Sequence, residues 1–283
     1  MKLVSYRHSG VARFGAVKDD GVVELSGRLG GQYPNLASVL GNGAMDAIRE
    51  LVAGRSPDVA LSDIEYDLPI PAPQKIMCIG RNYRAYHEVL EDGRPDWPSV
   101  FPRFVNSFAP HGQPIVRPKV DGDQLDYEGE IVVVIGKRCR HVAQADAMSV
   151  IGGYTVANEG SVRNWIGRGT QNCPVKNQYR SGSMGPWMVT ADEIDDPMKL
   201  HINTRVSGET RQDGGADMMI FDIPYVVAFV STITWLEPGD VICTGSPGGS
   251  AIEQDPPAYL KPGDVLEVEI PGIGLLRNSI EDE

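Results

Sequence analysis

Two glutamates separated by one residue constrain this chain most, because they lie in a segment whose pattern predicts a β-strand. The segment runs from Leu125 to Gly136 with the sequence LDYEGEIVVVIG, and a glycine ends its apolar, β-branched run. Side chains two apart in a strand share a face, so Glu128 and Glu130 should lie side by side. Paired carboxylates that face inward need a cation or a proton, and a hard divalent ion would serve. The alternative is an edge strand that presents both glutamates to solvent.

The acidic composition argues against a nucleic-acid-binding protein. The 283-residue chain carries a formal net charge of −12, whereas proteins that follow a phosphate backbone rely on clustered Lys and Arg. A bound metal and a few basic residues can still make one cleft attractive to a small anion. We therefore expect a small-molecule ligand and no nucleic-acid partner.

Three further features predict a cytoplasmic protein that does not enter a membrane. The N-terminal sequence MKLVSYRHSG lacks the apolar core of a signal peptide. The most apolar long window, residues 218–236, contains Asp222 and Pro224, so we do not expect it to span a membrane. The four cysteines are widely spaced and form no C-x-x-C pair, which fits reduced thiols better than disulfides or a zinc site.

Proline spacing predicts two parts. Pro69, Pro71 and Pro73 occupy alternate positions and should form a stiff, extended connector. We therefore expect a small N-terminal α+β module over residues 1–70 and a larger domain over residues 71–283. The module should contain short strands over residues 2–24 and a helix over residues 34–53, with Asn35 as its candidate N-cap.

The larger part is strand-rich, so the sequence predicts an α+β, β-rich fold class. Its pattern predicts a helix over residues 143–150 and a strand over residues 218–221. Asp222 and Pro224 should begin a further helix, because Pro is tolerated in a first turn.

Seven features of the larger part resemble the fumarylacetoacetate hydrolase (FAH) family. They are GRNY at 80–83, LDYEGE at 125–130, GYTVANEGSVR at 153–163, Lys176, MGPWMVT at 184–190, LEPGDVICTGSPGG at 236–249 and YLKPGDVLEVEIPGIGLLRN at 259–278. Their order over three quarters of the chain makes the resemblance specific. It implies an FAH-type fold of stacked mixed β-sheets with few helices, usually in a homodimer, with Mg²⁺, or else Mn²⁺ or Ca²⁺, in a pocket.

The resemblance implies a metal-binding set and a pocket lysine. Glu128 and Glu130 match the paired glutamates of the family, whereas Glu159 stands where the family has an aspartate. The longer side chain is still a hard oxygen ligand, so we expect a retained site with altered geometry. The alternative is that Glu159 caps the following turn. Lys176 would stabilise an oxyanion or enolate beside the metal, and its alternative is a solvated surface lysine.

The resemblance also implies contacts with a substrate. The Thr244 hydroxyl and neighbouring backbone N–H groups, with Gly245 allowing close approach, would face a substrate carboxylate. Arg81 and Tyr83 match positions at the edge of the family's pocket.

The chain departs from the family in the segment that would form a lid. Family hydrolases carry a His and a Glu that activate water, at positions held here by Tyr86 and Val89. A shift of one residue could restore a His–Glu pair: His87 directly follows Tyr86, and His87 and Glu91 are four apart and would face each other on a helix. The alternative is that this chain has no His–Glu pair in the lid segment. Ile166 also stands near the place of a usual glutamine.

The chemistry implied by the resemblance is formation of a metal-stabilised enolate from a keto acid. Our first expectation is hydrolysis of a C–C bond in an acylpyruvate-like or fumarylpyruvate-like β-diketo acid. The altered lid favours the alternatives, which are isomerisation or tautomerisation, decarboxylation, and dehydration of a 2-keto-3-deoxy sugar acid. A third hypothesis is a non-catalytic homologue whose substitutions have destroyed the site.

Overall fold

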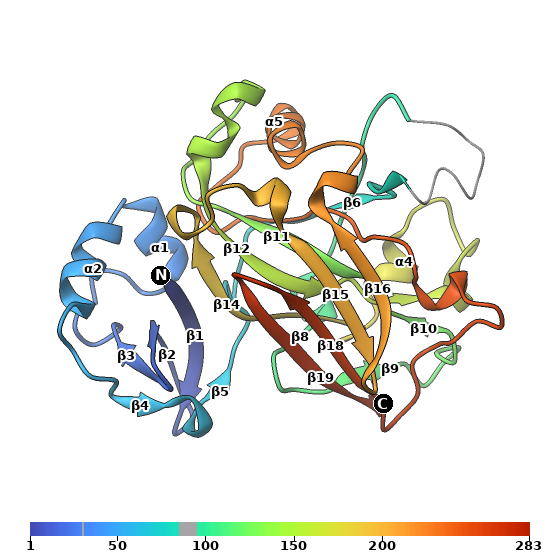
Figure 1. Cartoon of the computed structure of the whole chain (residues 1–283), viewed down its shortest axis with the longest axis horizontal. Helices are drawn as coiled ribbons and strands as arrows, with labels where there is room; N and C mark the ends of the chain where they lie inside the picture. The colour runs from blue at the N-terminus through green and yellow to red at the C-terminus, as the bar shows by residue number, and fades with distance from the viewer. Residues whose placement is uncertain (30, 85–94) are drawn as a thin grey trace.

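Stacked β-sheets dominate the computed structural model, which describes residues 1–29, 31–84 and 95–283 (Figure 1). The largest sheet comprises β1 (Lys2–His8), β2 (Val11–Lys18), β3 (Gly21–Glu24), β4 (Val59–Ala60), β5 (Glu65–Tyr66), β6 (Ile76–Gly80), β7 (Ser99–Pro102), β8 (Phe108–Pro110), β11 (Gly129–Ile135), β12 (Ile151–Asn158), β14 (Gly182–Thr190) and β17 (Val241–Cys243). A second sheet contains β9 (Ile115–Arg117), β15 (His201–Val206), β16 (Glu209–Gly215), β18 (Val265–Ile270) and β19 (Gly274–Asp282). A short pair joins β10 (Leu125–Asp126) to β13 (Ser161–Val162).

Both larger sheets are mixed. The main sheet has the order β4-β3-β2-β1-β14-β12-β11-β17-β6-β7, with β5 beside β1 and β8 beside β14, and the second has the order β16-β15-β18-β19-β9. The pairs β17–β6, β14–β8 and β19–β9 are parallel, and the other strand pairs are antiparallel. The expected β-rich fold of stacked mixed sheets with few helices is therefore confirmed.

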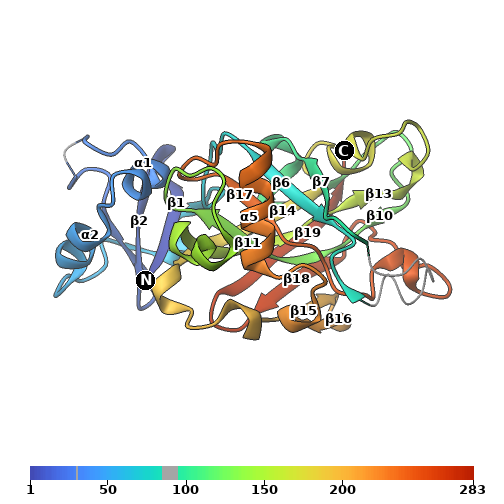
Figure 2. The same cartoon turned by 90° about the horizontal axis from the view of Figure 1, so that it is seen from above.

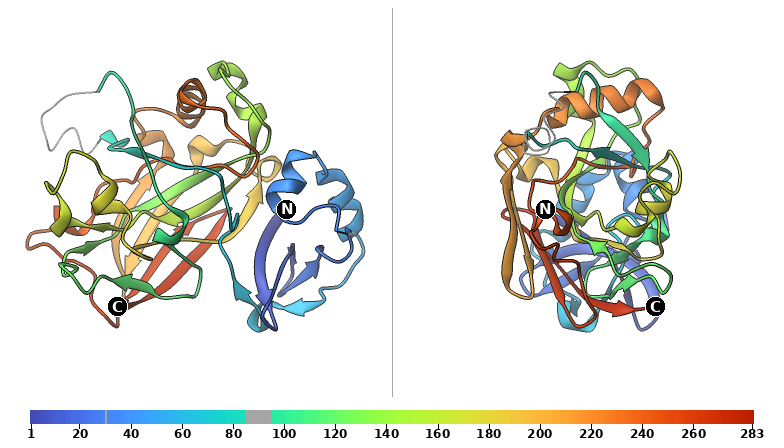
Figure 3. Two further views of the ribbon diagram at one scale, coloured as in Figure 1. Left: turned by 180° about the vertical axis from the view of Figure 1, so that it is seen from behind. Right: turned by 90° about the vertical axis from the view of Figure 1, so that its right-hand side faces the viewer.

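The N-terminal strands and two helices lie together at one end of the molecule (Figures 1 and 3). The side chain of Asn35 accepts the Ser38 N–H and so caps α1 (Leu36–Gly41), as the sequence predicts. The expected single helix is two, because the chain turns before α2 (Met45–Val52) and Gly43 adopts a φ of 63° there. β1 pairs with β14, so the main sheet continues into the rest of the chain. The boundary near residue 70 stays a prediction.

The helix α5 (Ile223–Ile233) crosses the main sheet (Figure 2). It begins where expected, because Asp222 accepts the Tyr225 N–H at 2.7 Å and Pro224 stands in the first turn. Val226, Val227 and Val230 pack into the same buried cluster as residues of β11 and β12. No helix in the part of the chain that the structure describes combines the length and apolar character needed to cross a membrane.

Three local predictions need correction. The helix expected over residues 143–150 is a 3₁₀-helix over Gln144–Val150, and residues 218–221 form no strand, because a 3₁₀-helix ends at Met218 and the chain then leads into α5. The segment from Leu125 to Gly136 is also not one continuous strand. Its backbone N–H groups at positions 127–129 donate to the side chains of Asp126, Asn158 and Gln212, which interrupts the strand pairing.

Gly129 lets the main sheet approach the second sheet closely. A Cβ atom at Gly129 would lie 2.3 Å from the Thr204 Oγ1 of β15 and 3.0 Å from the Val268 Cγ1 of β18. Both distances are shorter than ordinary van der Waals contact, so a larger residue would push the two sheets apart.

We expect Gly129→Ala to lower the free energy of unfolding by about 1–3 kcal/mol, the usual cost of overpacking a core. Urea unfolding measures this change. The control is Gly27→Ala, where the new Cβ meets only the flexible carboxylate end of Glu24, at 3.3 Å. An equal effect of the two substitutions would contradict the close approach of the sheets.

Candidate metal centre

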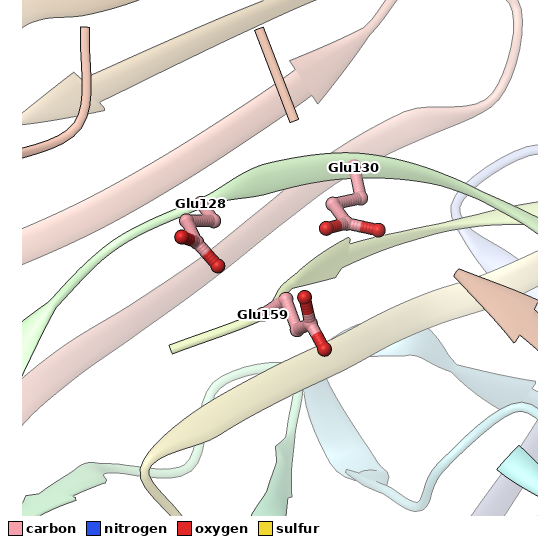
Figure 4. Close-up of side chains that lie close together, drawn as sticks. All are labelled: Glu128, Glu130 and Glu159. Atoms are coloured by element: carbon pink, nitrogen blue, oxygen red, sulfur yellow. The ribbon is translucent and has the colours of Figure 1, made fainter. Parts of the chain in front are cut away.

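Three buried carboxylates meet beside the N-terminal end of β11. Carboxylate oxygens of Glu128, Glu130 and Glu159, one from each residue, lie within 4.8 Å of one another. Glu130 lies on β11, Glu128 directly precedes this strand, and Glu159 directly follows the paired strand β12. Figure 4 shows Glu128 and Glu130 extending from one segment of the chain toward Glu159. The alternative of a solvated edge strand is wrong, because β11 lies between β12 and β17. We call these three residues the acidic cluster.

Backbone hydrogen bonds hold the two segments of the acidic cluster together. The Glu128 N–H donates to the Asn158 Oδ1 at 2.9 Å, and the Glu159 N–H donates to the Glu128 carbonyl oxygen at 2.7 Å. The Glu159 carboxylate accepts a hydrogen bond from Lys176 through Oε2, at 3.0 Å. Its Oε1 is buried and has no hydrogen-bond partner among the described residues. Glu159 therefore does not cap the following turn, and one of its oxygens is left for another ligand.

Lys176 lies inside the site rather than on the surface. It is the last residue of α4 (Cys173–Lys176) and is 7% exposed, so the alternative of a solvated lysine is wrong. Its ammonium group contacts the carboxylates of both Glu128 and Glu159. The positive charge of Lys176 thus lies directly against two members of the acidic cluster.

The sequence did not identify Arg163 and Asp126 as members of the site. The Arg163 guanidinium contacts the Glu128 Oε1 through Nη2 and the Asp126 Oδ2 through Nε, both at 2.7 Å. Asp126 is fully buried. The available signals were the position of Asp126 two residues before Glu128, which places both on one face, and the arginine that ends the GYTVANEGSVR motif.

The surroundings drive the pKa values of neighbouring glutamates apart. Burial opposes ionisation of Glu128, but the charges of Lys176 and Arg163 outweigh it and lower the pKa to about 2. Burial and the charge of Glu159 raise the pKa of Glu130 well above its ordinary value. Burial would lower the pKa of Lys176, but Glu128 and Glu159 outweigh it and raise that pKa. Glu130 is therefore the carboxylate that the described cations compensate least.

The donor set fits a divalent cation. Ionised, Asp126 and the acidic cluster carry four formal negative charges, whereas Lys176 and Arg163 together supply two positive charges. The deficit equals the charge of one divalent ion. Three carboxylates, one of which has an unpartnered buried oxygen, are also the ligand type that Mg²⁺, Mn²⁺ and Ca²⁺ prefer.

A cavity of about 780 Å³ opens over the acidic cluster. Lys176 and Arg163 line it together with apolar side chains. The apolar residues of its wall are Ile79, Phe101, Ile166, Val175 and Ile252. An anionic head group could therefore lie at the cluster while an apolar part faces these side chains.

The structure places the four expected substrate contacts differently from one another. Arg81 and Gly245 line the cavity, and the Gly245 N–H donates to the Glu130 Oε2 at 2.9 Å. Thr244 is fully buried, and its hydroxyl donates to the Ile131 carbonyl oxygen at 2.8 Å. The expectation that this hydroxyl faces a substrate in the cavity is therefore wrong. Tyr83 is also fully buried, and its backbone forms an isolated antiparallel β-bridge with Met219. It is not among the residues that line the cavity.

The candidate lid residues lie outside the described part of the chain. These are Tyr86, His87, Val89 and Glu91. The role of His87 and Glu91 stays a prediction.

We expect Lys176→Met to lower the free energy of unfolding of the metal-free protein by about 3–5 kcal/mol at pH 7, because the substitution leaves buried carboxylates uncompensated. The lowered pKa of Glu128 means that its ion pairs stabilise the folded state above about pH 4.5 and lose this effect as the pH falls towards about 2. The difference in the free energy of unfolding between wild type and Lys176→Met should therefore become smaller at low pH. Urea unfolding in EDTA measures it, with the exposed Lys137→Met as control. Equal losses for both variants at pH 7 would contradict this electrostatic role.

Known proteins resemble the chain in both sequence and structure. Residues 75–281 match the family model described as fumarylacetoacetate (FAA) hydrolase C-terminal. The chain is 33% identical over 243 residues to the mitochondrial oxaloacetate tautomerase FAHD2A of Homo sapiens, a match that covers 85% of this chain and 77% of that protein. It is 38% identical over 224 residues to the oxaloacetate tautomerase YisK of Bacillus subtilis (strain 168), with coverage of 78% and 74%.

A solved structure extends this similarity over the whole chain. The maleylpyruvate hydrolase from Sphingobium sp. SYK-6, in complex with manganese (II) ion and pyruvate, has a TM-score of 0.84 at 26% identity. The match covers 100% of this chain and 99% of the hydrolase chain. On the family model, the sequence identities and the shared fold, the chain belongs to the fumarylacetoacetate hydrolase family of enzymes.

Proposed function

We propose that this chain is a divalent-metal-dependent tautomerase that interconverts the keto and enol forms of a small 2-keto acid of the oxaloacetate class. One observation carries the proposal: the buried acidic cluster, which together with Asp126 would carry two more negative charges than Lys176 and Arg163 balance, lies beside the buried Lys176 at the wall of a cavity. Two relatives named as oxaloacetate tautomerases support the reaction class. The similar hydrolase structure that contains manganese and pyruvate supports the metal and the keto-acid ligand.

The metal ligands in this proposal are Glu128, Glu130 and Glu159, with Mg²⁺ or Mn²⁺ as the ion. Such an ion, when bound, acts as a Lewis acid toward a keto oxygen and favours the enolate. Arg163 and Ser161 orient Glu128, since both donate hydrogen bonds to its carboxylate. Lys176 keeps a positive charge beside the place where the enolate would develop negative charge.

Tautomerisation demands less of these residues than hydrolysis does. In a β-keto acid the carbon between two carbonyl groups is already acidic, so water can accept its proton, and the enolate oxygen then takes a proton from Lys176 or from water. Stabilising the enolate is therefore the main requirement. Because Lys176 is held protonated by its carboxylate partners, it acts as an electrostatic group or proton donor rather than as a base. Hydrolysis also needs a group that activates water, and no histidine is among the described residues that line the cavity.

Hydrolysis of a C–C bond in an acylpyruvate-like or fumarylpyruvate-like acid is the second candidate. The structural similarity to the maleylpyruvate hydrolase favours it. It would require a water-activating pair, for which His87 and Glu91 are the candidates from the sequence. The homodimer and the cytoplasmic location also stay predictions.

Metal binding should raise the melting temperature of the protein. An ion that binds only the folded state at 100 times its Kd adds about 2.7 kcal/mol to the free energy of unfolding. We therefore expect Mg²⁺ or Mn²⁺ to stabilise the wild type and Glu159→Gln to lose most of this effect, as measured by a thermal titration. Glu281→Gln, at an exposed position, should respond like the wild type. An unchanged response in Glu159→Gln would exclude this residue as a ligand.

Activity assays should separate the two candidate reactions. With Mn²⁺ present, we expect the protein to accelerate the keto–enol exchange of oxaloacetate, followed by ultraviolet absorbance. Lys176→Met should lower kcat by about 10²–10³-fold, as for the loss of one group that stabilises an oxyanion, whereas Lys137→Met should not. Cleavage of an acylpyruvate with oxaloacetate exchange at the background rate would contradict the tautomerase proposal and favour hydrolysis.

A further inference from the structure

We infer that Gln212 is a positioning residue for the metal centre, an inference that rests on the proposed function. Gln212 lies on β16 in the second sheet and is 1% exposed. It is neither a member of the acidic cluster nor part of the cavity wall. Its side chain nevertheless connects the glutamate-bearing strand with the glycine-rich segment 244–249, which borders the cavity.

The carboxamide of Gln212 uses its acceptor and both donors. Its Oε1 accepts the Gly129 N–H at 2.9 Å. Its Nε2 donates to the Ser246 Oγ and to the Pro247 carbonyl oxygen, both at 2.7 Å. A buried amide with all these bonds has one orientation only, because turning it over would set donor against donor.

Both ends of this connection reach the acidic cluster. Gly129 is the residue between Glu128 and Glu130, so Gln212 fixes the backbone from which both carboxylates extend. On the other side, the Gly245 N–H donates to the Glu130 Oε2. A shift of the segment relative to β11 would therefore move the donor that orients Glu130.

A second buried amide holds the other end of the glycine-rich segment. The Asn82 Nδ2 donates to the Thr244 carbonyl oxygen at 2.8 Å and to the Phe221 carbonyl oxygen at 2.9 Å. Between the two amides, Gly245 has a φ of 100°, and a Cβ there would lie 2.7 Å from the Asn82 Cβ. The segment is thus packed too tightly to adjust locally.

The segment also lies directly on the strand that carries Gln212. A Cβ at Gly249, whose φ is also 100°, would lie 2.1 Å from the Arg211 carbonyl oxygen. The separation between segment and strand is therefore set by backbone contact, and Gln212 sets its register. In other metal sites, the residues that orient the ligands affect metal affinity. We therefore expect metal affinity here to depend on the position of the segment relative to β16.

The test compares Gln212, whose hydrogen bonds reach the segments that carry the acidic cluster, with Asn278, a buried amide away from the cavity wall. Gln212→Met removes all three hydrogen bonds with little change of volume. Asn278→Leu is the matched control, since the Asn278 Nδ2 also donates to two carbonyl oxygens, of Pro110 and Gln113, both at 2.7 Å, outside the cavity wall. The Kd for Mn²⁺ is measured by isothermal titration calorimetry and by the electron paramagnetic resonance signal of free Mn²⁺, and unfolding is measured alongside.

We expect Gln212→Met to raise the Kd for Mn²⁺ by about tenfold, whereas Asn278→Leu destabilises the fold and leaves the Kd unchanged. If Gln212→Met does not fold, Gln212→Asn provides the same readout, because it keeps a polar amide that is one methylene too short to span both sides. An unchanged Kd in the Gln212 variant that folds, or an equal rise in Asn278→Leu, would overturn the inference alone. Failure of the wild type to bind Mn²⁺ would instead overturn the proposed function, and the inference with it.

Discussion

The burial of three carboxylates within 4.8 Å of one another is the constraint on which the rest of the structure depends. Removing even one charge from water costs several kcal/mol unless a partner compensates it. Lys176 and Arg163 supply part of that compensation, and both contact Glu128. The arrangement leaves Glu130 and one oxygen of Glu159 without a cationic partner among the described residues. A divalent cation would complete the balance of charge.

The fold keeps this costly cluster rigid. Glu130 lies on a strand that is paired on both sides, and the neighbouring Gly129 packs against the second sheet. The Gly245 N–H donates to the Glu130 carboxylate and holds it in place. The Glu128 N–H donates to the Asn158 side chain, which fixes the backbone at Glu128. Groups that are held in place before a substrate binds need little reorganisation when charge develops, which is the main requirement for stabilising an enolate.

The sequence predicted the parts of the structure that follow from local rules. The period of two along a strand placed Glu128 and Glu130 on one face, and the helix starts at Asn35 and Asp222 follow from capping. The order of motifs led to the family and to its mixed sheets. These rules cover the strand-rich character of the chain, the two helix starts and the shared face of the glutamate pair, but not the limits of every strand.

Other features depend on contacts between distant segments, which local rules do not contain. The burial of Lys176, the bridge from Arg163 to Asp126, and the bond from the Thr244 hydroxyl to Ile131 all join residues that are far apart in the chain. The break in the strand before Gly129 arises in the same way, from the side chains of Asn158 and Gln212.

The most direct test of a divalent-metal centre at the acidic cluster is anomalous diffraction from crystals soaked in Mn²⁺. We expect one peak about 2.0–2.3 Å from an oxygen of each glutamate of the acidic cluster. The absence of a peak between the three carboxylates would contradict a metal centre there.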